Sequence, residues 1–129
     1  MPAESEPTGS RGLGPDDLAK RSADLMLDKK AGEVVIMDLR GLTSVTDFFV
    51  MGTGESDVQV KAIVDHLNET LRLEHIKPIH IEGYEQLSWV LMDYVDVVAH
   101  VFLPEARDYY RLERLWADAK ISAVGGSES

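Results

Sequence analysis

The sequence predicts an α/β fold, in which one mixed sheet of five strands is flanked by helices. Apolar residues recur at the 3.6-residue spacing of helices in three segments, 16–30, 56–71 and 105–120. Short β-branched and aromatic runs, which are typical of strands, separate these segments. The run VVAHVFL at 97–103 is apolar on both faces, so both faces of its sheet should be covered.

The individual elements follow from local signals. Pro15 suits the start of the first helix. Ser56 opens the second helix, and Gln59 follows it at the spacing of a capping box. The predicted order is helix 16–30, strand 33–39, strand 48–54, helix 56–71, strand 78–82, strand 89–93, strand 96–103 and helix 105–120, or α-β-β-α-β-β-β-α.

Length and charge limit the domain number and the partners. The 129 residues suit one domain. We expect residues 16–120 to form it, with disordered tails at 1–15 and 121–129 because these segments are poor in large apolar residues. The formal net charge is −10. Nucleic-acid binders concentrate Lys and Arg, so DNA and anionic membranes are disfavoured, and a basic protein is the expected partner.

The absence of certain residue types excludes several classes of protein. The sequence contains no cysteine, which removes disulfides, thiol catalysis and cysteine-based zinc sites. No apolar run approaches the roughly 20 residues that span a bilayer, and the first residues do not resemble a signal peptide. We therefore expect a cytoplasmic protein.

The predicted hairpin at 89–103 places two acids near an aromatic residue. A two-residue turn at 94–95 would bring Asp93 opposite Asp96. The same register would pair Trp89 with His100. Adjacent carboxylates repel each other, so they either solvate the turn, hold a metal ion, or bind a partner's Arg together with the Trp.

Val95 argues against that turn. Two-residue hairpin turns need residues that accept positive φ, and a β-branched side chain disfavours it. A four-residue loop would avoid the strain and would change the register.

Two further patterns give weak chemical signals. The sequence GTGES at 52–56 precedes a helix, as a phosphate-binding loop does, but it lacks the Lys and Ser/Thr of a P-loop. An N-capped helix explains it equally well. His80 and Glu82 share a strand face, but two ligands are too few for a metal site. We predict no metal, no cofactor and no catalytic residue.

The last predicted helix carries an unusually broad apolar face. Tyr110, Leu112, Leu115 and Trp116 all contribute to it, and Arg residues flank it. Tyr, Trp and Arg dominate binding hot spots. The face either packs on the sheet or forms part of an interface, and Leu112 suits either role.

Four blocks of the sequence resemble the ribosomal silencing factor family, also called the Iojap-like family. They are DLRGLTSVTDFFVMGTG, QVKAIVDHL, KPIHIEGYEQLSWVLMDYVDVVAHVF and YYRLERLW. Together they cover about residues 16–118. The chain departs from the family pattern at Val95, where Gly is common, and at Asp57 and Val58, where Ser and Arg are common.

The resemblance implies a function. Members bind the large ribosomal subunit through ribosomal protein L-fourteen, block joining of the small subunit, and so lower translation when nutrients are short. The resemblance also implies a fold similar to nucleotidyltransferases, no catalysis, and a homodimer in the free protein. The residues that match the family pattern and are expected to contact the ribosomal protein are Trp89, Asp93, Tyr94, Tyr110, Leu112, Leu115 and Trp116.

Two alternatives belong to other classes. In the first, the protein is a nucleotidyltransferase-like enzyme that uses Asp93 and Asp96 to hold Mg²⁺ and the loop at 52–56 to hold a triphosphate. Such enzymes usually place an Asp-x-Asp pair on one strand, which this sequence lacks. In the second, the aromatic helix is the self-interface of a dimerisation module.

Overall fold

The computed structural model describes residues 13–125, apart from the side chain of Tyr109. The tails predicted to be disordered fall largely outside this range, at 1–12 and 126–129. The elements are α1 Pro15–Asp28, β1 Gly32–Asp38, β2 Phe48–Thr53, α2 Asp57–Leu73, β3 His80–Glu82, β4 Trp89–Asp93, β5 Val97–Phe102, α3 Pro104–Tyr110, α4 Leu112–Leu115 and β6 Lys120–Ala123.

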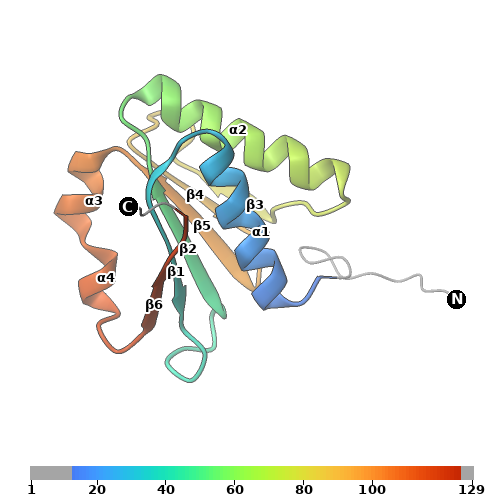
Figure 1. Ribbon diagram of the computed structural model, residues 1–129, viewed down its shortest axis with the longest axis vertical. Coiled ribbons are helices and arrows are strands. Elements are labelled where there is room, and N and C mark those ends of the chain that lie inside the picture. Colours follow the sequence, from blue (N-terminus) through green and yellow to red (C-terminus); the bar gives the residue numbers. More distant parts are fainter. Residues whose placement is uncertain (1–12, 126–129) are drawn as a thin grey trace, which may run out of the picture.

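One mixed sheet forms the centre of the molecule, as predicted. Its strand order is β3-β4-β5-β2-β1-β6, and only β2 and β5 run parallel to each other among the paired strands described. Figure 1 shows α1 and α2 together on one side of the sheet, and α3 and α4 on the other. Helices therefore flank both faces, which confirms the α/β fold class.

Alternating side chains of β2 divide the interior into two cores. Phe48 and Val50 point to the core beneath α1 and α2. Phe49 and Met51 point to a smaller cluster on the opposite face, which contains Leu112 of α4. This alternation follows from the two-residue period of a strand. The second cluster is small because α3 and α4 are short and cover only part of that face.

The predicted cap of the second helix is present. Ser56 Oγ accepts a hydrogen bond from the Gln59 backbone N–H at 3.2 Å, and the Gln59 side chain accepts one from the Glu55 N–H at 2.7 Å. The Gln59 amide also donates to the carbonyls of Lys29 and Lys30, at the end of α1. Gln59 thus caps α2 and also fixes the end of α1 against it.

The predicted hairpin register is wrong by two residues. Asp93 faces Val98 and Trp89 faces Phe102, so Asp93 does not face Asp96. The backbone N–H of Tyr94 donates to the Val97 carbonyl at 2.8 Å, which places the turn at 95–96. A shift of two residues keeps the same side chains on each face of the sheet.

The turn places Val95 in the left-handed region, with φ 76°. The Asp96 N–H donates to the Tyr94 carbonyl at 2.9 Å, closing a γ-turn around Val95. The Asp93 carboxylate accepts from the Val95 N–H at 2.8 Å and holds the turn closed. This backbone conformation favours glycine, the residue that the family resemblance leads one to expect here.

Replacing Val95 with Gly should raise the free energy of unfolding by about 1 kcal/mol. Relief of left-handed strain is worth about 1–2 kcal/mol, and the added freedom of the unfolded chain cancels part of it. Urea unfolding of the two proteins measures the difference. Val58, which is 75% exposed, supplies the control, because Val58→Gly within α2 should destabilise. A destabilised Val95→Gly would contradict this account of the turn.

The structure also differs from the single last helix predicted over 105–120. A left-handed residue, Arg111, with φ 50°, ends α3 and separates it from α4. Lys120–Ala123, predicted as helix end and tail, instead forms β6 and pairs with β1. All four of its residues are exposed, so its sequence carries no buried apolar pattern. The unpaired edge of β1 explains the sixth strand better than the strand's own composition does.

Candidate protein-binding face

A groove lies where α4 stops short of covering the sheet. Its volume is about 300 Å³. Phe49, Leu91 and Val98 of β2, β4 and β5 supply apolar lining, and Trp116 supplies it from the end of α4. The parallel pairing of β2 with β5 brings Phe49 beside Val98. The groove is therefore a product of the sheet topology rather than of one segment.

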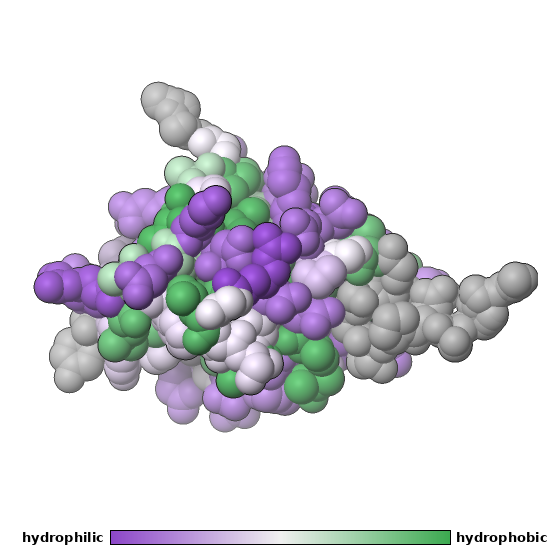
Figure 2. Space-filling view, turned by 90° about the horizontal axis from the view of Figure 1, so that it is seen from below, coloured by the Kyte–Doolittle hydropathy of each residue, from purple (hydrophilic) through white to green (hydrophobic). Residues whose placement is uncertain are grey.

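Apolar surface continues from the groove onto a neighbouring loop. Val45, in the loop between β1 and β2, lines the groove and is 81% exposed. Leu42 in the same loop is 43% exposed. Figure 2 views the molecule from below Figure 1 and shows hydrophobic side chains in separate patches among hydrophilic ones. Exposed apolar surface beside a groove is typical of a protein-interaction site.

Aromatic side chains pack together at the groove, where Phe49, His100 and Trp116 form part of its lining and further rings pack behind them. The ring of Trp89 lies 5.5 Å from that of Phe102 and 4.6 Å from that of Tyr110, measured between centroids. Phe49 contacts His100 edge-on at 4.5 Å and Trp116 edge-on at 6.1 Å. These contacts hold the large rings in fixed positions, which lowers the entropy that they would lose on binding a partner.

His100 lies beneath this aromatic layer and is only 2% exposed. Trp89 Nε1–H donates a hydrogen bond to His100 Nδ1 at 3.0 Å. Burial lowers the pKa of His100 to about 3. The imidazole is therefore neutral at physiological pH, and because Nδ1 accepts a hydrogen bond, its proton resides on Nε2.

The neutral His100 should make the fold sensitive to mild acid. Its folded-state pKa of about 3 lies below the unfolded value of 6.5, so the unfolded chain binds a proton first as the pH falls. This stability is complete above pH 6.5 and declines below it. Between pH 7.5 and pH 5, the wild type should lose about 2 kcal/mol more than His100→Asn. Equal losses in urea unfolding would contradict the assignment.

Acidic side chains line the groove at the end formed by β3 and β4. Asp93 and Glu82 both line it, and His80 lies between them. His80 Nε2 is 3.0 Å from a Glu82 carboxylate oxygen, and His80 Nδ1 is 3.9 Å from one of Asp93. An apolar groove with an acidic end is complementary to a basic protein surface that carries apolar side chains.

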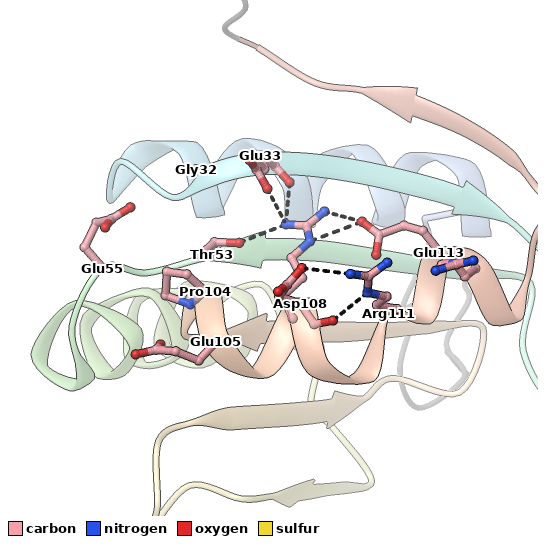
Figure 3. A pocket seen from close by; sticks show the side chains of 11 residues that line it. Gly32, Glu33, Thr53, Glu55, Pro104, Glu105, Asp108, Arg111 and Glu113 are labelled. Carbon is pink, nitrogen blue, oxygen red and sulfur yellow. Dashed lines mark hydrogen bonds and ion pairs between the residues drawn. The ribbon is translucent and has the colours of Figure 1, made fainter.

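A further, polar cavity of about 700 Å³ lies along α3, and residues of α3 and α4 line it together with Gly32, Glu33 and Thr53 of the sheet. The Arg107 side chain, 9% exposed, occupies its inner wall. Its guanidinium donates to the Glu33 carbonyl at 2.8 Å, to Thr53 Oγ1 at 2.9 Å and to the Glu113 carboxylate at 2.7 Å. Figure 3 shows these three groups converging on one guanidinium. Because hydrogen bonds within the protein engage most of its N–H donors, Arg107 joins α3 and α4 to the sheet.

Comparison with known proteins identifies the family. A family model described as "Ribosomal silencing factor during starvation" matches residues 14–128. The chain belongs to the ribosomal silencing factor family. A protein of Halalkalibacterium halodurans named ribosomal silencing factor RsfS is 42% identical over 110 residues, which are 85% of this chain and 94% of that protein. A Bacillus subtilis protein of the same name is 39% identical over 95 residues, or 74% of this chain and 80% of that protein.

A solved structure supports the same relationship. The crystal structure of a Chromobacterium violaceum protein superimposes with a TM-score of 0.79 at 34% identity, covering 88% of this chain and 95% of that one. The resemblance inferred from the sequence is thereby confirmed.

In this ribosomal silencing factor, no helix within the described part of the chain has the length and apolarity needed to cross a membrane.

The structure brings together part of the predicted contact set. Trp89, Asp93 and Trp116 lie around one face, with Tyr110 packed on Trp89. Leu115 is the last residue of α4 and is 71% exposed. These residues come from β4, α3 and α4, and only the folded sheet brings them into proximity.

Two predicted contacts are corrected. Tyr94 is fully buried in the core under α1 and α2, on the opposite side of the sheet from the groove. Its position at the turn makes it an anchor of the hairpin. Leu112 is 8% exposed and packs in the smaller cluster. Neither side chain is available to a partner that docks on the groove.

The sequence did not identify several residues of the groove as site residues. Phe49 and Val98 belong to strands that are distant in sequence, and their adjacency depends on the β2–β5 pairing. Thr46 and Val45 come from a loop with no distinctive pattern. The strongest available signal was the β-branched and aromatic character of the two strands, which predicts burial rather than a site.

The magnesium alternative receives no support. Asp93 and Asp96 do not face each other, and no group of three possible metal-ligating side chains occurs within residues 13–125. The helix start after the loop at 52–56 is occupied by the Ser56 and Gln59 caps. The backbone donors that a phosphate would need at this end are therefore partly used within the protein.

Proposed function

We propose that this ribosomal silencing factor represses translation by binding the large ribosomal subunit through ribosomal protein L-fourteen. Bound there, it sterically blocks joining of the small subunit. The observation that carries the proposal is the groove, which is apolar and aromatic with acids at one end, on a domain whose chain has a net charge of −10. A basic ribosomal protein offers the complementary surface, and the overall negative charge disfavours direct contact with rRNA.

The proposed contact set is Trp89, Asp93, Tyr110, Leu115 and Trp116, of which Asp93 and Trp116 line the groove. Trp89 and Trp116 supply rigid apolar area, and Asp93 supplies charge. Tyr110 and Leu115, which are 48% and 71% exposed, extend the surface along α3 and α4. Aromatic residues in such a position dominate binding energy at protein interfaces.

A silencer of this kind needs affinity and bulk but no chemistry. The proposal therefore assigns no enzymatic activity and no cofactor, and places the protein in the cytoplasm with its ribosomes. The family description, "during starvation", suggests nutrient limitation as the condition for silencing. We further propose that the free protein is a homodimer, which sedimentation at increasing concentration would detect.

A reconstituted joining assay tests the function directly. Large subunits are incubated with the protein and pelleted, and then small subunits are added and 70S formation is measured. We expect co-pelleting at a one-to-one ratio and a dose-dependent loss of joining. Unchanged joining with saturating protein would contradict the proposal. Addition of the protein to preformed 70S ribosomes provides the control, because the proposed site is then covered.

A further inference from the structure

The loop that joins β1 to β2 carries exposed apolar side chains beside the groove. Val45 is 81% exposed and Leu42 is 43% exposed. Within residues 13–125, neither side chain belongs to either core of the sheet. Figure 1 shows this loop extending beyond the ends of the strands that it joins. The fold therefore gains little from these two side chains, whereas burial against another molecule would remove their apolar area from water.

Hydrogen bonds of the loop hold Val45 in a fixed position. Its backbone N–H donates to Thr43 Oγ1 at 3.1 Å. The Thr43 N–H donates to the Leu39 carbonyl at 3.3 Å, and the Leu39 N–H donates to the Asp47 carbonyl at 2.9 Å, which closes the base of the loop. The Asp47 N–H in turn donates to the Asp96 carbonyl at 3.0 Å and ties the loop to the turn between β4 and β5. A loop ordered in this way loses little conformational entropy when a partner binds it.

A single exposed apolar residue is common on protein surfaces, but Val45 is not isolated. It lines the groove together with Trp116 and with the acids Asp93 and Glu82. Leu115, which is 71% exposed, immediately precedes Trp116. The loop thus adds a projecting apolar contact to a surface that already offers aromatic and acidic ones.

The charges of this surface favour a basic protein as the molecule that covers it. Glu82 and Asp93 line the groove, and none of its lining residues in the described part of the chain is Lys or Arg. A phosphate backbone would therefore meet negative charge here, whereas the Lys and Arg side chains of a protein would be attracted. Because Val45 lies on a projecting loop, its burial requires an apolar depression in that protein.

We propose that Val45 inserts into an apolar depression on the basic protein partner while the groove contacts the adjoining surface. Leu42 packs at the edge of the same contact, and basic side chains beside the depression face Glu82 and Asp93. The β1–β2 loop thereby selects the shape of the partner surface, and the acids select its charge. This inference rests on the proposed function and adds to its site a contact residue and a feature that the partner must have.

Substitution of two exposed valines separates this contact from folding. Val45→Ser removes the apolar contact, and Val58→Ser is the matched control, because Val58 is 75% exposed on α2, on the opposite face of the sheet. Titration of labelled protein with isolated large subunits measures binding, and urea unfolding measures stability. We expect Val45→Ser to bind about 10-fold more weakly, or about 1.4 kcal/mol, with an unchanged unfolding midpoint. Val58→Ser should bind as the wild type does.

Photo-cross-linking identifies the molecule that the loop contacts. Benzoylphenylalanine in place of Val45 should cross-link to a basic protein of the purified large subunit, and the same group in place of Val58 should not. Cross-links from position 45 to rRNA alone, or to a second copy of the chain alone, would overturn the inference.

The outcomes distinguish this inference from the proposed function. Normal binding by Val45→Ser, or an equal loss in Val58→Ser, with the wild type binding tightly, would overturn the loop contact and leave the silencing function intact. Failure of the wild type itself to bind large subunits would overturn the proposed function and this inference together.

Discussion

Replacing Arg107 with Ala is expected to lower the free energy of unfolding by about 2–3 kcal/mol. The guanidinium bonds to Glu33 of β1, Thr53 of β2 and Glu113 of α4, and it is nearly buried. Its removal leaves the Thr53 hydroxyl and the Glu113 carboxylate without their shared donor. A helix of four residues has little stability of its own, so α4 should loosen as well.

Urea unfolding of Arg107→Ala and Arg114→Ala measures this effect. Arg114 lines the same polar cavity and is exposed, so its replacement should change stability by less than about 0.5 kcal/mol. Equal stabilities of the two variants would contradict the role given to Arg107. Arg107→Ala should also weaken subunit binding, because α4 leads to Trp116, which lines the groove, and α3 carries Tyr110, which packs on Trp89.

Replacing Trp116 with Ala is expected to weaken binding to the large subunit about 30-fold, or about 2 kcal/mol. Trp116 lines the groove, contacts Phe49 edge-on and remains partly exposed, which is the situation of a binding hot spot. Titration of the variant with isolated large subunits measures the loss. Circular dichroism and urea unfolding check that the sheet and its main core stay folded.

Leu73 supplies the matched control for this prediction. It is 82% exposed at the end of α2, on the helices that pack on the opposite face of the sheet. Leu73→Ala therefore removes exposed apolar area without altering the groove and should bind normally. Normal binding by Trp116→Ala, or an equal loss in both variants, would contradict the assignment of the binding face.

Local patterns predicted most of the fold. The helices α1 and α2 were predicted because apolar spacing, Pro15 and the Ser56 cap all agree with each other. The last helix was predicted wrongly because apolar spacing continues through Arg111, although the backbone there is left-handed. The sixth strand was missed because its pairing depends on the free edge of β1 and not on its own sequence.

The candidate site was predicted less completely than the fold. Trp89, Asp93 and Trp116 were found by residue type and by family resemblance, and they do share one face. Tyr94 and Leu112 match the family equally well but are buried, since matching residues serve folding as well as binding. The partnership of Phe49 with Val98 depends on a parallel pairing of distant strands, which short-range patterns do not specify.

A reconstruction of this protein bound to its own large ribosomal subunit tests the central claim most directly. We predict that the groove, with Trp89 and Trp116 beside it, contacts ribosomal protein L-fourteen. The layer formed by α1 and α2 should face away from the subunit surface, with its acids distant from rRNA. Docking through α1 and α2, or contacts made mainly to rRNA, would contradict the account.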